Sequence, residues 1–189
     1  ETIYIYIYMK YIVSFTTSPL RIYKCYPMIK SILNQSRKPD LILLNLPYIF
    51  ERTNQPYNIP HYISNDLSDD IIINRVNRDY GPGTKIIPTI SYLKYNGYDA
   101  NDTYIIYLDD DIRYPKNMIQ IFESNNNSNN SNNNLIWCSS GLNFSKSNYN
   151  NINYNINGVR NHNKNCMIAE GYGGVCVKLS IFEDDFYLQ

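Results

Sequence analysis

Several features that identify common protein classes are missing from this chain of 189 residues. Its 17 basic and 17 acidic residues balance, so no net charge favours nucleic acid or an anionic membrane as a partner. The four cysteines include no CxxC pair and show no metal-ligand spacing, which predicts small core residues of a protein from a reducing compartment. The two histidines, His61 and His162, have no partner at metal-ligand spacing, and we expect both at the surface.

A long apolar run is also missing. The stretch IYIYIYMKYIVSF (3–15) is too short to span a membrane and is interrupted by Lys10. It lacks the basic start and the small-residue cleavage site of a signal peptide. We therefore expect a protein of the cytoplasm or of the cytoplasmic face of a membrane. Because the chain begins at Glu1 and ends in FEDDFYLQ without a cap, we also expect it to be a fragment, truncated at its C-terminus.

Strand-like and helix-like segments alternate along the chain. Runs of β-branched and aromatic residues predict strands over 11–17, 40–47, 71–76, 102–111 and 135–140. Apolar residues near helical spacing, with prolines in the first turns, predict helices over 23–36, 84–98 and 115–124. This alternation predicts a single α/β domain over 1–189, with a mostly parallel sheet flanked by helices. The Asn-rich stretch 125–134 cannot bury apolar surface and predicts a flexible insertion.

Three consecutive aspartates follow the apolar run YIIYL at the end of a predicted strand. In parallel sheets, ligands bind at the carboxyl ends of strands, near a topological switch point. Asp109 and Asp111 are well placed to share a hard divalent cation, whose remaining ligands a diphosphate can supply. If the strand continues, Asp110 points the other way, towards a backbone amide, a ribose or solvent. Alternatively, the triplet caps the helix that begins near Pro115.

Three further segments carry candidate ligand-binding residues. In NRDYGPGTK (77–85), which is not a Walker loop, two glycines shape a turn and Lys85 could receive phosphate, or the segment is a tight connection with an exposed lysine. In FTTSPLRI (15–22), hydroxyls and Arg21 could bind a nucleotide or belong to a polar loop. In EGYGG (170–174), Glu170 could hold an acceptor hydroxyl, or the stretch is only a turn.

In their order and spacing, these segments resemble the nucleotide-sugar glycosyltransferases of the GT-A type, most closely the family-2-like enzymes of bacteria and large viruses. The resemblance spans residues 10–186 and is carried by SFTTSPLRI, SILNQSRKPDLILLNLP, NRDYGPGTKIIPTI, YIIYLDDDIRYP and EGYGGV. It implies a GT-A, Rossmann-like fold. It also implies metal-dependent transfer of a sugar from a nucleotide-sugar donor, UDP-sugar above all, to a hydroxyl acceptor on a glycan, lipid or protein.

The resemblance implies roles for individual residues. Asp109 and Asp111 match the DxD motif that binds Mn²⁺ or Mg²⁺ together with the donor diphosphate. The residues implied in nucleotide-sugar binding are Thr16, Thr17, Pro19, Arg21, Asp79, Gly81, Lys85, Asp109 and Asp110, and those implied on the acceptor side are Glu170, Gly173 and Gly174. An inverting transferase needs a carboxylate base. Asp184 and Asp185, the last acidic residues, are the candidates, unless the base lies beyond Gln189.

Two other functions fit the same residues. A non-catalytic nucleotide- or carbohydrate-binding module of the same fold would result from loss of the base. A phosphotransferase would use Asp109 as a nucleophile, although the motif lies deep in the chain. Metal-dependent hydrolysis of nucleotide sugars separates the transferase from a binding module, which should show none.

Overall fold

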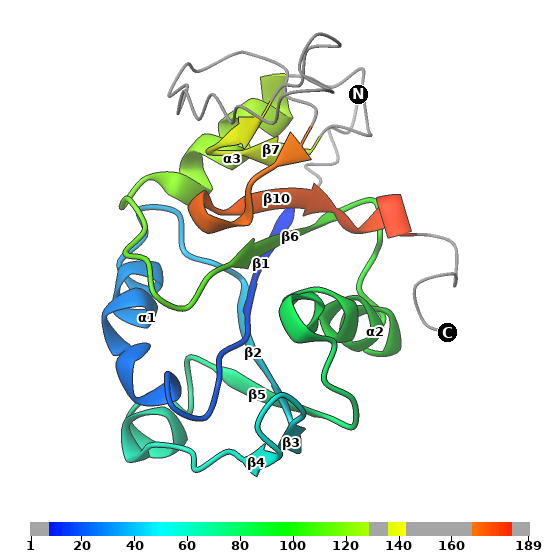
Figure 1. Cartoon of the computed structure of the whole chain (residues 1–189). Helices are drawn as coiled ribbons and strands as arrows, with labels where there is room; N and C mark the ends of the chain where they lie inside the picture. The colour runs from blue at the N-terminus through cyan, green and yellow to red at the C-terminus, as the bar shows by residue number, and fades with distance from the viewer. Residues whose placement is uncertain (1–7, 129–135, 143–167, 183–189) are drawn as a thin grey trace, which may run out of the picture.

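A six-stranded sheet forms the centre of the molecule (Figure 1). The computed structural model describes residues 8–128, 136–142 and 168–182. Across the sheet the strands follow the order β5 (Ile72–Val76), β2 (Leu41–Pro47), β1 (Lys10–Phe15), β6 (Thr103–Leu108), β10 (Val175–Lys178) and β7 (Trp137–Cys138). The first four are parallel to one another, and β10 is antiparallel to both β6 and β7. The predicted α/β domain with a mostly parallel sheet is confirmed.

Helices cover both faces of this sheet (Figure 1). On one face lie α1 (Tyr26–Leu33) and α3 (Met118–Ser128), and on the other lies α2 (Ile87–Tyr95). Successive side chains of a strand point to opposite faces, so β1 contributes side chains to the hydrophobic cores on both sides of the sheet. Val13 joins the core with α1 and α3, whereas its neighbour Ile12 joins the core with α2. The long apolar run of β2 is buried for the same reason.

Short elements complete the described chain. Helical turns of the 3₁₀ type are η1 (Ile22–Lys24), η3 (Gly81–Lys85), η5 (Gly171–Gly173) and η6 (Leu179–Phe182), and η2 (Tyr62–Asp66) is a π-type turn. Two-stranded ribbons join β3 (Ile49–Phe50) to β4 (Gln55–Pro56) and β8 (Gly141–Leu142) to β9 (Ile168–Ala169). The polar stretch 51–70 also contributes to the core, through Tyr57, Ile63 and Leu67.

The predicted helices exist, with shifted boundaries. The helix predicted over 84–98 begins at Ile87, because the preceding residues form the η3 turn with Gly81 at φ +56°. It stops before Gly97, whose φ of +72° ends a helix at little steric cost. Helix α3 continues to Ser128, so residues 125–128 of the predicted insertion are helical, and 129–134 lie outside the described residues.

Substitution of Ile106 tests whether β6 lies at the centre of the packed sheet. Its side chain is fully buried, and its backbone lies between Val13 of β1 and Cys176 of β10. We expect Ile106→Ala to lower the free energy of unfolding by about 3 kcal/mol, because the substitution leaves a cavity in the core. Urea denaturation measures this loss. The control is Ile72→Ala, whose side chain is 41% exposed and whose loss should stay below about 1 kcal/mol. Equal losses would contradict the layered core.

Candidate functional site

The hydroxyl-rich loop and the acidic triplet leave neighbouring strands at the same edge of the sheet. Strands β1 and β6 are parallel and pair through Phe15 and Leu108, the last residue of each. From β1 the chain proceeds to β2 on one side, and β6 lies on the other, so the strand order reverses between β1 and β6. The segments after Phe15 and Leu108 therefore meet at a topological switch point, the place where open α/β sheets bind ligands.

Asp110 is the buried member of the triplet. Only 8% of the residue is exposed, and its carboxylate accepts hydrogen bonds from the Thr17 hydroxyl, at 2.5 Å, and from the Arg21 guanidinium. The predicted orientation towards a backbone amide, a ribose or solvent differs from this arrangement. That prediction assumed that side chains continue to alternate as in a strand. The strand β6 ends at Leu108, and the triplet lies on a turn. Asp110 thus ties the loop after β6 to the loop after β1.

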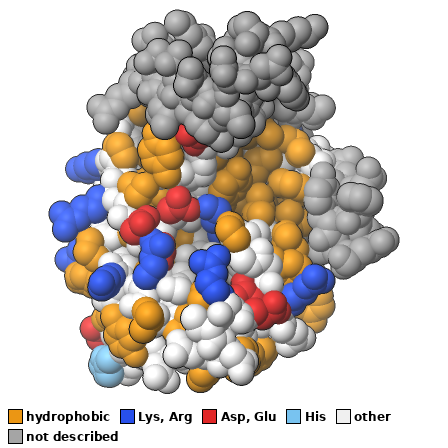
Figure 2. All heavy atoms as spheres, in the orientation of Figure 1, with side chains coloured by type: hydrophobic (Ala, Val, Ile, Leu, Met, Phe, Trp, Pro, Cys, Tyr) orange, Lys and Arg blue, Asp and Glu red, His pale blue; other side chains and the backbone are white. Residues whose placement is uncertain are grey.

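The two outer aspartates are each paired with a cation. Asp111 is an exposed residue whose carboxylate lies 2.8 Å from the Arg21 guanidinium, so Arg21 bridges Asp110 and Asp111. Asp109 accepts a 2.6 Å bond from Nζ of Lys85, whose side chain is only 15% exposed. Acidic and basic side chains lie side by side near the middle of the face seen in Figure 2. The repulsion within the triplet is offset by these two cations.

The turn that carries Lys85 is organised by Asp79. One carboxylate oxygen accepts bonds from the Gly81 amide, at 2.8 Å, and from the Thr84 hydroxyl, at 3.2 Å. The other accepts the Glu51 amide at 3.1 Å. Asp79 and Gly81 were predicted to lie at the donor site, and both shape the η3 turn. Through these contacts, Asp79 and Gly81 stabilise the turn that carries Lys85.

A buried polar network lies directly beneath this turn, and none of its side chains is among the predicted site residues. The Ser14 hydroxyl bonds to the Lys85 carbonyl at 2.5 Å and to the Thr89 hydroxyl at 2.6 Å. The Asn45 amide donates to both hydroxyls, at 2.9 and 2.8 Å, and accepts from Asn74 at 2.7 Å. The available signal is a single polar residue within an apolar strand, as in YIVSF and LILLNLP. The network holds the start of α2, and with it Lys85, against the sheet.

The EGYGG segment packs against the triplet loop. A Cβ on Gly174, whose φ is +89°, would approach Leu108 Cδ2 to 3.0 Å, and a Cβ on Gly173 would meet Ser139 Oγ at 1.8 Å. A Cβ on Gly171 would lie 3.2 Å from Nζ of Lys85. Gly173 and Gly174 are required because this end of the turn lies so close to its neighbours, whereas the lysine side chain near Gly171 can move aside. Glu170 accepts a hydrogen bond from the Ser140 hydroxyl.

The remaining predicted residues have varied positions. The Thr16 hydroxyl donates to the Asn45 carbonyl at 2.8 Å, and Pro19 lies in the turn that leads to Arg21. Asp184 and Asp185 lie outside the described residues. Away from the site, His61 is exposed, as predicted, and His162 is outside the described residues. Cys25 and Cys176 are buried free thiols, which confirms their prediction as core residues.

Cys25 lies beside the Asp110 anchor. Its Sγ is 3.4 Å from the Thr17 hydroxyl and 3.9 Å from the Asp110 carboxylate. Burial raises the pKa of the Cys25 thiol to about 11, so the sulfur stays protonated at neutral pH. The thiol therefore adds a weak donor beneath the site and no further negative charge.

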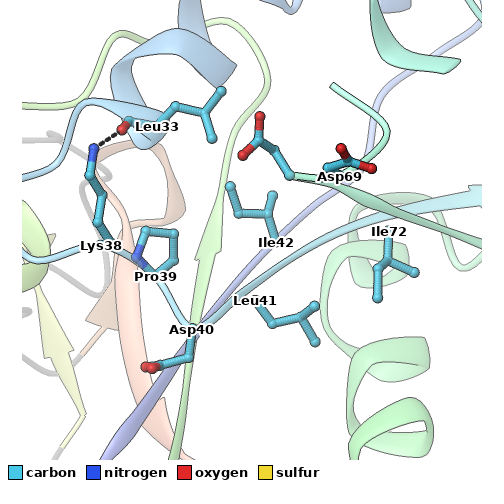
Figure 3. Close-up of a pocket in the computed structure, with 9 residues that line it drawn as sticks. Leu33, Lys38, Pro39, Asp40, Leu41, Ile42, Asp69 and Ile72 are labelled. Atoms are coloured by element: carbon cyan, nitrogen blue, oxygen red, sulfur yellow. Dashed lines mark hydrogen bonds between the residues drawn. The ribbon is translucent and has the colours of Figure 1, made fainter. Parts of the chain in front are cut away.

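A separate hollow of about 430 Å³ lies at the opposite edge of the sheet (Figure 3). Its lining includes Leu41 and Ile42 from the start of β2 and Ile72 from the start of β5. Asp69 also lines it. These are amino ends of strands, where open α/β sheets do not usually bind ligands. The hollow is therefore a second feature, distinct from the triplet.

The donor set of the triplet suits a hard cation. Asp109 and Asp111 offer carboxylate oxygens, the ligands that Mg²⁺ and Mn²⁺ prefer, while Asp110 is occupied by Thr17 and Arg21. Among the described residues, no three acidic, cysteine or histidine side chains are grouped so as to hold a metal ion. A cation here would rely on two outer carboxylates together with ligand oxygens.

Comparisons with known proteins give no close relative. No protein-family model matches the chain, and no curated protein matches it. A crystal structure of 4-diphosphocytidyl-2C-methyl-D-erythritol synthase is similar at a TM-score of 0.49 and 9% identity, over 92% of this chain and 77% of that one. The apo form of mouse xyloside xylosyltransferase 1 is similar at a TM-score of 0.41 and 14% identity, over 96% of this chain and 70% of that one. Likenesses this distant carry no functional conclusion.

None of the described helices is long and apolar enough to cross a membrane.

The anchoring role of Asp110 can be tested against its neighbour. We expect Asp110→Asn to lower the free energy of unfolding by about 2 kcal/mol, because a buried carboxylate loses its charge opposite Arg21 and Thr17. Asp111→Asn is the matched control. Its side chain is 62% exposed, and its loss should stay below about 0.5 kcal/mol. Both are measured by urea denaturation at pH 7, and a larger effect of the Asp111 variant would refute the anchor.

Proposed function

We propose that this chain is the donor-binding domain of a metal-dependent glycosyltransferase, which transfers a sugar from a nucleotide sugar to a hydroxyl acceptor. One observation carries the proposal. At the switch point between β1 and β6, two outer carboxylates and two cations are held together, with Lys85 on Asp109 and Arg21 on Asp111. Such a cluster contains ligands for both a divalent cation and a diphosphate.

The charge of the cluster explains why both ligands would bind together. Three aspartates and two cations leave one net negative charge, which repels a diphosphate by itself. A divalent cation on Asp109 and Asp111 changes this to one net positive charge, which attracts a diphosphate. Lys85 and Arg21, released from the carboxylates, then become available to phosphate oxygens. The donor diphosphate and the metal thus favour each other's binding.

The reaction needs little covalent chemistry from the protein. The acceptor hydroxyl attacks the anomeric carbon, the bond from that carbon to the diphosphate oxygen breaks, and a carboxylate base takes the hydroxyl proton. When bound, Mn²⁺ or Mg²⁺ neutralises charge on the leaving diphosphate. Lys85 and Arg21 stabilise the same charge. In this proposal Glu170, beside the η5 turn, would orient the acceptor, and Asp184 or Asp185 would be the base.

A ligand panel tests this function. We expect UDP-sugars, in preference to GDP- or dTDP-sugars, to raise the melting temperature by roughly 5 °C with Mn²⁺ present, at ligand concentrations near 100 times Kd. Asp109→Asn should abolish the shift, because it removes one of the two outer carboxylates. Asp69→Asn, in the hollow at the other edge of the sheet, is the control and should keep it. No metal-dependent shift with any nucleotide sugar would reject the proposal. Release of UDP from the donor with water as acceptor would separate an enzyme from a binding module.

Lys85 is expected to affect the two ligands in opposite directions. In Lys85→Met, Asp109 no longer has a competing cation, so Mn²⁺ alone should bind about threefold more tightly. UDP in the presence of Mn²⁺ should bind roughly tenfold more weakly, because a phosphate partner is lost. Isothermal titration calorimetry measures both affinities. Lys30→Met, an exposed position on α1, is the control and should change neither. A parallel change in both affinities would argue against competition between Lys85 and the metal.

A further inference from the structure

A buried phenol joins the acidic loop to the η5 turn. Tyr114 is only 5% exposed, and its hydroxyl oxygen accepts the Asp109 amide at 2.9 Å. The same hydroxyl lies 3.2 Å from the Asp109 carbonyl and 3.3 Å from the Tyr172 carbonyl. The Tyr114 amide donates to the Ser31 hydroxyl on α1 at 3.0 Å, which fixes the base of the side chain. One hydroxyl therefore contacts both the metal-side and the acceptor-side segments.

The hydroxyl has one proton and two carbonyl acceptors. Burial raises the pKa of Tyr114, so the phenol keeps its proton at neutral pH. That proton can point at the Asp109 carbonyl or at the Tyr172 carbonyl, and only one of them receives it fully at a time. A small movement of the Asp109 backbone would therefore change which carbonyl is favoured, and the Tyr172 carbonyl would gain or lose a donor.

The C-terminal end of η5 packs closely on its neighbours, whereas Tyr172 in its middle is half exposed. A Cβ on Gly174 would lie 3.7 Å from the Tyr114 ring and 3.2 Å from Met118 Sδ. The Gly171 position is equally close to Lys85, the ion-pair partner of Asp109. Gly174 itself is buried, so a movement of the Tyr114 ring would displace the C-terminal end of η5.

We propose that Tyr114 is a positioning residue. It couples the identity of the cation that pairs with Asp109, Lys85 or a metal ion, to the geometry of the η5 turn. The inference rests on the proposed function, because it assigns to the same site a link between donor-side and acceptor-side segments. In the ion-paired state Asp109 is held by Lys85. When a cation and a diphosphate replace that pair, the Asp109 loop adjusts, and Tyr114 passes the adjustment to Tyr172. Coupling of this kind is reciprocal, so a ligand bound at η5 changes the metal affinity by the same factor as the metal changes the affinity for that ligand.

The chain contains a natural reporter of η5. Trp137 is its only tryptophan and lies in β7. Two positions later, the Ser139 hydroxyl donates to the Gly173 carbonyl at 2.5 Å. Tryptophan emission therefore reports on a strand that is hydrogen-bonded to the turn. A matched control exists as well: Tyr11 is a buried tyrosine whose hydroxyl accepts one bond, from Asn126 at 3.1 Å, near the opposite edge of the sheet.

The first experiment needs no ligand. Asp109→Asn should shift the Trp137 emission spectrum in the parent protein and in the Tyr11→Phe background. In the Tyr114→Phe background the shift should fall to less than a third of that size, because the connecting hydroxyl is gone. Far-ultraviolet circular dichroism confirms that each variant is folded at the temperature used. An equal shift in all three backgrounds would overturn the coupling.

The second experiment adds Mg²⁺ to protein with UDP present. We expect Tyr114→Phe to weaken the apparent Mg²⁺ affinity about fivefold and to abolish the emission response, whereas Tyr11→Phe changes neither. A residue with only a structural role would lower the melting temperature and leave the Mg²⁺ midpoint in place, and that result would refute the inference. If the parent protein binds neither Mg²⁺ nor UDP while the first experiment shows coupling, the proposed function fails and the link through Tyr114 stands.

Discussion

Three adjacent carboxylates repel one another, and the structure around the switch point of the sheet offsets that repulsion. Asp110 is buried and held by Thr17 and Arg21, while Asp109 is paired with Lys85. Thr17 and Arg21 come from the loop after β1 and Lys85 from the η3 turn, so the compensation also determines how these segments lie. The acidic triplet is thus the point at which the loops after β1 and β6 and the η3 turn are joined.

The supports of the site extend from this centre into the core. Lys85 lies on the η3 turn, which Asp79 shapes from within and the Ser14–Asn45–Thr89 network holds from below. A buried polar network that is fully bonded gives directional contacts that an apolar core lacks. The backbone of Lys85 is therefore held by rigid elements, and its ammonium group is held by Asp109.

Much of this could be predicted from the sequence. The strands, the two-faced burial of β2 and the placement of the triplet at a strand end follow from local patterns such as YIIYLDDD. The partners of the triplet could not be predicted. Thr17 and Arg21 are 93 and 89 residues from Asp110, and nothing local to either position indicates the contact. The alternation rule also gave the wrong orientation for Asp110, because the strand ends one residue before the triplet begins.

The glycines of EGYGG illustrate the same division. Their sequence predicts a turn, but the reason that Gly173 and Gly174 cannot carry side chains is the proximity of Ser139 and Leu108. Nothing in YIIYLDDDIRYP indicates that the Tyr114 hydroxyl contacts the distant Tyr172 carbonyl. The sequence by itself determined the order of strands and helices and the chemical groups available at the strand ends, since these depend on neighbouring residues. Only the tertiary structure decided which carboxylate is buried, which cation it meets and which segments share a hydroxyl, because those contacts join residues far apart in the chain.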